Sequence, residues 1–234
     1  MDNKDKLILA LDTSDIEEIS SILNDVSPPL NIVKIGPIAF LPNSEKIIEI
    51  IHSKNLSVMF DFKFFDIPNT IKNSLRFLFE INTKIFTIHS LSGPEAIKTV
   101  SEELLTLEQE LGIPKPEMFA VTILTSFDKN QLKSIGLEEN IDENVLRLVE
   151  LSIKSGVDGV VCSGEEIELI KRNFGDSVKI LVPGVRMEHR NDDQKRIITP
   201  KEALSKGADY IVLGRTLTEE PDKKKRINDI IKSL

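Results

Sequence analysis

Eight short runs of β-forming residues recur along the chain, and each is followed by a segment with the apolar spacing of an amphipathic helix. This alternation constrains the fold most, because strands that are separated by helices pair in parallel through right-handed crossovers. The runs are residues 7–12, 32–36, 56–63, 84–89, 117–123, 159–162, 179–183 and 210–214.

Eight strand–helix units in 234 residues predict an α/β fold of the (β/α)8 type, the TIM barrel. A doubly wound open sheet is the alternative that the same alternation can build. No linker rich in proline, glycine or serine divides the chain, so we predict a single domain over residues 1–234. The polar stretch 138–144 is not assigned to an element.

The charge balance of the chain limits its partners. Acidic side chains outnumber basic ones by 38 to 30, which gives a formal net charge of −8, and there is no long basic run. We therefore expect no nucleic acid and no membrane as a partner, although a local basic pocket could hold a phosphate. The first apolar run is too short for a signal peptide or a membrane span, so we expect a cytoplasmic protein.

A single cysteine, Cys162, excludes an intramolecular disulfide and a thiolate metal cluster, which fits a reducing compartment. It stands in an apolar strand-like run, so we interpret it as a small buried hydrophobe rather than a nucleophile. His52 and His189 are too dispersed in the sequence to predict a metal site. His89 ends the fourth run, and we expect it to position its neighbours.

Charged side chains end three successive strands. Catalytic groups of such barrels gather at the carboxyl ends of the strands, and alternation along residues 57–63 directs Asp61 and Lys63 inward. The same alternation directs Asp12 and Lys34 to this mouth. Each charge alone could be a solvated strand end or a structural ion pair, but four together would be costly to bury for stability alone.

Two further segments fit the mouth of a barrel. Asp66 lies three residues beyond Lys63 in a turn that leads to Pro68, a residue suited to the first turn of a helix. After the eighth run, Gly214 and Arg215 suit a phosphate site, although Gly214 could simply end the strand. The polar stretch after the seventh run is longer than an ordinary connection, and we predict a phosphate-gripping lid at about 184–199.

The run DFKFFDIPNT, residues 61–70, resembles the D-x-K-x-x-D-I-P-N-T signature of the orotidine 5′-phosphate decarboxylase family. Further resemblances follow in the order of the family: LALD at 9–12, VKIG at 33–36, VTILTS at 121–126, VPGVR at 182–186, DQ at 193–194 and GADYIVLGR at 207–215. The chain departs from the family at 91–94, where a Gly-Gly pair is common, and at 215–217, where Arg-Pro is usual. Neither departure removes a catalytic group.

The resemblance implies decarboxylation of orotidine 5′-phosphate to UMP and CO₂, without cofactor or metal, as the last step of de novo UMP synthesis. Loss of CO₂ leaves a carbanion at C6 whose lone pair lies in the ring plane, so it must be stabilised electrostatically. By this resemblance Lys63 would stabilise and then protonate C6, and Asp61 would lie near the substrate carboxylate. Lys34 and Asp66 would complete an alternating network of charges.

The resemblance also implies substrate-binding residues and a homodimer whose active sites are shared across the interface. Asp12 and Lys34 would bind the ribose, and Asp66 and Thr70 would bind the ribose of the ligand in the neighbouring subunit. Thr125 and Ser126 would contact the pyrimidine. The phosphate would be bound by Gln194, Arg215, the Gly214 backbone and Arg186.

Two alternative functions remain open. Barrel enzymes of the 3-hexulose-6-phosphate synthase or 3-keto-L-gulonate-6-phosphate decarboxylase type share D-x-K-x-x-D but use Mg²⁺ to stabilise an enediolate. Residues 67–70, residues 124–126 and Lys34 favour the pyrimidine enzyme. The second alternative is a catalytically silent barrel that senses UMP, and the intact set of charges around Lys63 argues against it.

Overall fold

The computed structural model describes residues 3–186 and 198–234, and its centre is a closed barrel of parallel strands. Each strand pairs with the next in sequence, and β8 pairs with β1 to close the sheet. The strands are β1 (Leu7–Leu11), β2 (Ile32–Ile35), β3 (Ser57–Phe64), β4 (Thr83–His89), β5 (Glu117–Val121), β6 (Gly159–Val161), β7 (Lys179–Val182) and β8 (Tyr210–Leu213). The closed sheet confirms the predicted (β/α)8 barrel and excludes the alternative of a doubly wound open sheet.

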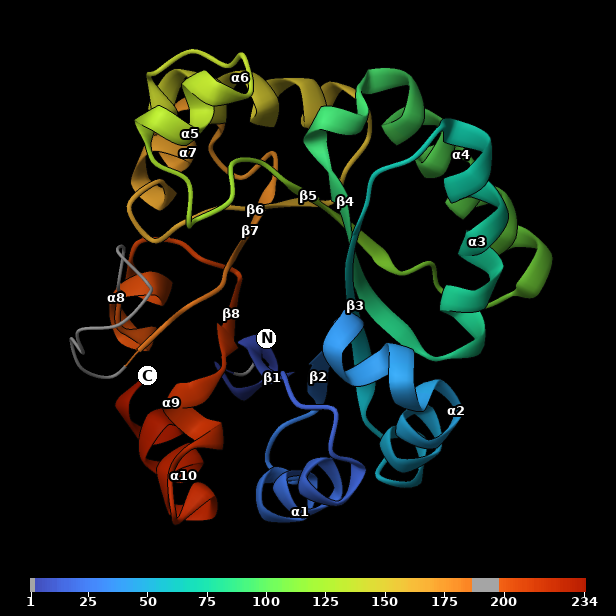
Figure 1. The fold of residues 1–234 in the computed structure, drawn as a ribbon, viewed down its shortest axis with the longest axis vertical. Helices are drawn as coiled ribbons and strands as arrows, with labels where there is room; N and C mark the ends of the chain where they lie inside the picture. The colour runs from blue at the N-terminus through green and yellow to red at the C-terminus, as the bar shows by residue number, and fades with distance from the viewer. Residues whose placement is uncertain (1–2, 187–197) are drawn as a thin grey trace.

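Helices form a ring outside the strands, as Figure 1 shows. They are α1 (Ile16–Val26), α2 (Pro37–Ser53), α3 (Pro68–Glu80), α4 (Pro94–Leu111), α5 (Lys129–Ser134), α6 (Ile141–Lys154), α7 (Ile167–Phe174), α8 (Pro200–Ser205), α9 (Arg215–Thr218) and α10 (Lys223–Ser233), with short 3₁₀ turns η1 (Asn3–Lys6) and η2 (Ser90–Ser92). No helix among the described residues is long and apolar enough to cross a membrane.

Local sequence signals explain where several helices begin. Proline occupies the first turn of α2, α3, α4 and α8, where its missing N–H leaves no bond unmade. The polar stretch left unassigned in the sequence turns out to start α6, because the Asn140 side chain accepts a hydrogen bond from the Glu143 N–H as an N-cap. Its polarity is therefore that of a helix start.

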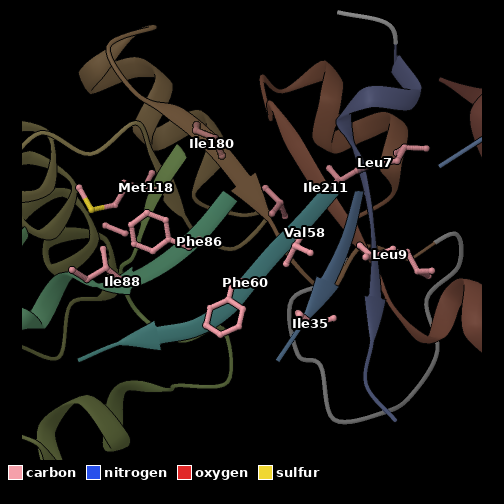
Figure 2. Packing of buried hydrophobic residues seen from close by; sticks show 14 of the residues in the cluster. Leu7, Leu9, Ile35, Val58, Phe60, Phe86, Ile88, Met118, Ile180 and Ile211 are labelled. Carbon is pink, nitrogen blue, oxygen red and sulfur yellow. The ribbon is translucent and has the colours of Figure 1, made fainter. Parts of the chain in front are cut away.

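Buried side chains form two cores, one on each side of the sheet. The outer core lies between strands and helices and includes Leu9 on β1 and Val58 and Phe60 on β3, which Figure 2 labels. The inner core fills the barrel and includes Met59 and Phe119. The alternation predicted for residues 57–63 is thereby confirmed for its first part, with Val58 and Phe60 outside and Met59 inside.

Packing inside the barrel is tight at β6. A side chain at Gly159 would overlap the ring of Phe119, so this strand position requires glycine for steric reasons. Cys162, just beyond β6, is fully buried in the outer core, as predicted. Burial, followed by the nearby Glu166 carboxylate, raises the pKa of the Cys162 thiol, which keeps it in the unreactive thiol form.

The predicted strands agree with the observed ones within one or two residues at each end. Several predicted strands extend past the observed carboxyl end of the strand. The extra residues, which include Asp12, Gly36, Pro183 and Gly214, lie between the strand and the following helix. These turning residues form the mouth of the barrel.

Candidate active site

Four charged side chains meet at the carboxyl ends of β1, β2 and β3. Asp12 follows the last residue of β1, Lys34 lies in β2, and Asp61 and Lys63 lie in β3. Because β1 pairs with β2 and β2 with β3, these three strand ends are adjacent. The convergence that strand alternation predicted is therefore present.

The four side chains form a continuous chain of ion pairs. Lys34 Nζ lies 2.9 Å from Asp12 Oδ1 and 3.7 Å from Asp61 Oδ2. Lys63 Nζ lies 2.9 Å from Asp61 Oδ1. Lys34 and Asp61 side chains are each only 14% exposed, whereas Lys63 is 40% and Asp12 58% exposed. The centre of the chain is thus shielded, while both of its ends remain accessible from the cavity.

Asp61 is held in its ionised form. Burial by itself raises the pKa of this carboxyl, but the charges of Lys34 and Lys63, with hydrogen bonds from Lys63 and Thr87, together outweigh it. The pKa of Asp61 therefore lies below its usual range. An ionised carboxylate accepts hydrogen bonds only, which matches the donors that surround it.

The backbone of β3 is irregular where it carries the central ion pair. Phe60 pairs with Phe86 and Phe64 pairs with Ile88. Between these two pairs the chain advances by four residues in β3 but by only two in β4. Within this irregular stretch Lys63 has a φ of +46°, in the left-handed region that non-glycine residues rarely adopt. The sequence reasoning treated this stretch as a regular strand and did not foresee the bend.

Thr87 of β4 contacts both members of the pair and was also missed. Its hydroxyl accepts a hydrogen bond from the Lys63 N–H at 2.9 Å and donates one to Asp61 Oδ1 at 2.9 Å. The signal that could have revealed it is a polar residue between the apolar Phe86 and Ile88, two residues before His89.

Two adjoining cavities open beside the ion-pair chain and share Lys34 and Asp61 in their linings. One, of about 170 Å³, has mostly apolar walls with Lys63 and Thr125. The other, of about 240 Å³, is lined by residues that include Asp12, Gly214, Arg215 and Arg186. We call these the apolar lobe and the arginine lobe. Lys34 and Asp61 stand at the boundary between them.

The loop after β7 and the start of α9, directly after β8, line one side of the arginine lobe. Arg186 is 8% exposed, and its N–H donates to the carbonyl of Ile198 at 3.0 Å, which joins the two described ends of the predicted lid. Gly184 has a φ of +71°, a conformation that favours glycine at this bend. Thr216 Oγ1 donates to the Val185 carbonyl at 3.1 Å and links these two segments. Gln194 lies outside the described residues.

The residues predicted to serve a neighbouring subunit, Asp66 and Thr70, do not line either lobe. Asp66 and Thr70 are exposed, and Asp66 Oδ1 accepts a hydrogen bond from the Ile67 N–H at 2.7 Å. Within the part of the chain that the structure describes, Asp66 makes no ion pair, and Asp12 occupies the end of the charge chain beside Lys34. The place of Asp66 in the charge network stays a prediction. Ser126 is also exposed, next to Thr125 in the apolar lobe.

His89 lies beside this site without joining the ion pairs. Burial, followed by the charge of Lys63, lowers the pKa of His89, so the imidazole is neutral near pH 7. Its Nδ1 accepts a hydrogen bond from the Leu91 N–H, and its ring centroid lies 5.8 Å from that of Phe65. Across residues 3–186 and 198–234, no group of three or more His, Cys, Asp or Glu side chains is placed to hold a metal ion.

A larger and more open groove, of about 590 Å³, lies between α4 and α6 on the helical surface. Two of its lysines are already engaged, because Lys154 pairs with Glu150 at 2.6 Å and Lys98 with Glu102 at 3.8 Å. Converging charges on strand ends favour the barrel mouth as the functional site, despite its smaller cavities.

A sequence profile of the orotidine 5′-phosphate decarboxylase / HUMPS family matches residues 5–230, nearly the whole chain. The chain belongs to this family. The match includes the ion-pair chain, both lobes and all of the helices and strands that position them.

Individual members of the family are similar over almost their full length. The orotidine 5′-phosphate decarboxylase of Coxiella burnetii is 34% identical over 232 residues, 98% of this chain and 96% of its own. That of Actinobacillus pleuropneumoniae is 35% identical over 223 residues, 95% of this chain and 94% of its own. The crystal structure of orotidine 5′-phosphate decarboxylase from Lactobacillus acidophilus has a TM-score of 0.83 at 30% identity, covering 97% of each chain.

The ionised state of Asp61 predicts how stability depends on pH. Its pKa is lower in the folded protein than in the unfolded chain, where it is about 3.9. The contribution of the Asp61 carboxylate to the free energy of unfolding is therefore complete above the pKa of the unfolded chain. It is lost as the pH falls through the pKa of the folded protein. Asp61→Asn should lower the free energy of unfolding by about 1.5 to 3 kcal/mol at pH 7, measured by urea denaturation.

That difference between wild type and Asp61→Asn should stay constant down to about pH 5 and shrink below about pH 4. Asp25→Asn is the matched control, because it removes an exposed carboxylate of α1 and should change stability by less than about 0.5 kcal/mol throughout. A constant difference down to pH 2 would contradict the account of Asp61.

Proposed function

We propose that this protein decarboxylates orotidine 5′-phosphate to UMP and CO₂ without a cofactor or metal ion. The observation that carries the proposal is the placement of the Lys63 ammonium in the apolar lobe, paired with Asp61 at 2.9 Å. Members of the matched family that are named orotidine 5′-phosphate decarboxylase support it.

The shape and charge of the two lobes suit a pyrimidine nucleotide. The apolar lobe offers mostly apolar walls to a ring, with Thr125 as a polar contact at its edge. Asp12 and Lys34, at the boundary side of the arginine lobe, suit ribose hydroxyls. Arg186 and Arg215 suit a phosphate dianion, because guanidinium groups bind phosphate oxygens through several N–H donors.

Lys63 would perform the chemical step. When the bond between C6 and the carboxyl carbon breaks, its electron pair stays on C6 in the plane of the ring. The Lys63 ammonium stabilises this developing charge and then transfers a proton from Nζ to C6, giving UMP and neutral lysine. Asp61 holds that ammonium in place before the reaction, and Lys34 pairs with the other oxygen of Asp61, so little reorganisation is needed when charge develops.

The phosphate group of the substrate is remote from C6, so it would contribute to catalysis through its binding energy. Contacts from Arg186, Arg215, the Gly214 backbone and Gln194 would favour closure of the lid at about 184–199 over the substrate. Binding energy from such a remote group can lower the chemical barrier when closure completes the site.

We further propose that the protein works in the cytoplasm in the last step of de novo UMP synthesis. The reaction itself supports the place in the pathway, because UMP is its product.

The direct test of the function is turnover of orotidine 5′-phosphate by the purified protein, followed by absorbance with and without EDTA. Activity in EDTA is the expected result. Activity that appears only with added Mg²⁺, or on a sugar phosphate instead, would support the magnesium-dependent branch of the family. Binding of UMP without turnover would support a sensor.

Lys63→Ala should lower kcat by at least about 10³-fold, because both electrostatic stabilisation and proton donation are lost. The dissociation constant for UMP should change by less than about tenfold, since UMP carries no developing charge at C6. Lys98→Ala, which removes an exposed lysine of α4, should leave both quantities unchanged. A kcat for Lys63→Ala within tenfold of wild type would overturn the mechanism.

We also propose a homodimer that shares its active sites. Large apolar side chains are exposed on α2, on the loop after β3 and on η2; they are Ile38, Leu41, Phe65, Ile67 and Leu91. These elements are adjacent, since Phe40 of α2 packs on Phe60 of β3 and Ser92 Oγ donates to the Phe64 carbonyl. Exposed apolar side chains on adjacent elements favour an interface between subunits, and such an interface would bring Asp66 and Thr70 to a partner's site.

Subunit mixing tests this arrangement. Lys63→Ala and Asp66→Ala dimers should each be inactive, and mixing them should restore up to about a quarter of wild-type activity, since half of the dimers are hybrids with one intact site. Mixing Lys63→Ala with Asp61→Ala is the control, and it should restore nothing because both residues serve the same subunit's site. With subunit exchange verified by mass, no recovery in the first mixture would assign Asp66 to its own subunit.

A further inference from the structure

Thr87 makes an unusual pair of contacts for a residue in a barrel strand. Its side chain is fully buried, and its single hydroxyl joins the backbone N–H of Lys63 to the carboxylate of Asp61, with both distances at 2.9 Å. Asp61 Oδ1 in turn accepts from Lys63 Nζ. One hydroxyl on β4 thus contacts the backbone of one catalytic candidate and the side chain of the other.

The directions of these hydrogen bonds are fixed by chemistry. A backbone N–H can only donate, so the Thr87 oxygen must accept from Lys63. The hydroxyl hydrogen is then free to point at Asp61, and an ionised carboxylate is a suitable acceptor for it. The arrangement therefore works with Asp61 in its charged state and disfavours a protonated one.

Lys63 needs such support because its backbone lies outside regular strand geometry. Its φ of +46° is unfavourable for a residue with a side chain, and surrounding contacts must hold it there. The β3–β4 ladder is interrupted between Phe60 and Phe64, so the regular strand register does not provide that hold. The Thr87 hydroxyl accepts the hydrogen bond from the Lys63 N–H in place of the interrupted ladder.

A second threonine of β4 provides a comparison. Thr83 is also buried, and its partner across the β3–β4 ladder is Val58. Its hydroxyl, at the opposite end of the strand, has no hydrogen-bond partner among the described residues. Thr87 differs from Thr83 because it lies opposite the bend at Lys63 and bonds to it.

We propose that Thr87 is a positioning residue: it holds Lys63 in its left-handed bend and orients the Asp61 carboxylate, so that the Lys63 ammonium stays fixed in the apolar lobe. The consequence for turnover rests on the proposed decarboxylation. The hold on the Lys63 backbone does not depend on which reaction the site performs.

Kinetics of Thr87→Val test the consequence for turnover, because valine keeps the shape of the side chain and removes the hydroxyl. We expect kcat for orotidine 5′-phosphate to fall between about tenfold and a hundredfold, as for a small misplacement of a reacting group, with KM within about threefold of wild type. Thr87→Ser, which restores the hydroxyl, should return kcat to within about threefold of wild type. Thr83→Val is the matched control and should leave kcat unchanged.

Amide hydrogen exchange at Lys63, measured by NMR on the ligand-free protein, tests the hold itself. Exchange should be at least about tenfold faster in Thr87→Val and unchanged in Thr87→Ser and Thr83→Val. If Thr87→Val does not fold, Thr87→Ala removes the same hydroxyl without adding bulk and is measured in its place.

The two measurements separate the possible failures. If the wild type does not decarboxylate orotidine 5′-phosphate, the proposed function fails, and the exchange rates still decide whether Thr87 holds Lys63. Wild-type exchange at Lys63 in Thr87→Val overturns the inference whatever the activity. A wild-type kcat in Thr87→Val, or an equally low kcat in Thr87→Ser, overturns the role in positioning.

Discussion

The buried Asp61 carboxylate, bound between Lys34 and Lys63, is the interaction on which the rest of the site depends. A carboxylate that is 14% exposed is unstable in its charged form unless cations and donors surround it, and here two ammonium groups and a hydroxyl do so. The same contacts fix the two lysines. Removing the carboxylate would leave two like charges facing each other at the barrel mouth.

The fold supplies the rigidity that this group requires. Three adjacent strands carry the charges, and each strand is fixed on one side by the inner core and on the other by the outer core. Side chains on packed strands keep their positions better than side chains on loops, so the bend at Lys63 can persist. Of the described phosphate-binding candidates, Arg186 lies in the loop after β7, and Gly214 and Arg215 lie at the start of α9.

Much of this arrangement could be predicted from the sequence, because strand alternation is a local property. The alternation of apolar residues gave the eight strands, and parity gave the inward direction of Asp61, Lys63 and Lys34. The bend at Lys63 could not be predicted, since it lies where the register between β3 and β4 shifts, and that register is not a local property of the sequence. Thr87 escaped notice for the same reason, because a threonine within a strand is ordinary until its partner across the ladder is known.

The central claim is that Asp61 acts on the reaction through Lys63, and a double-mutant cycle tests it most directly. The rate of release of labelled CO₂ from orotidine 5′-phosphate would be measured for Asp61→Asn, Lys63→Ala and the double variant. If Asp61 acts through Lys63, the double variant should be no more than about threefold slower than Lys63→Ala alone. Losses that multiply in the double variant would contradict the claim and give Asp61 an independent role.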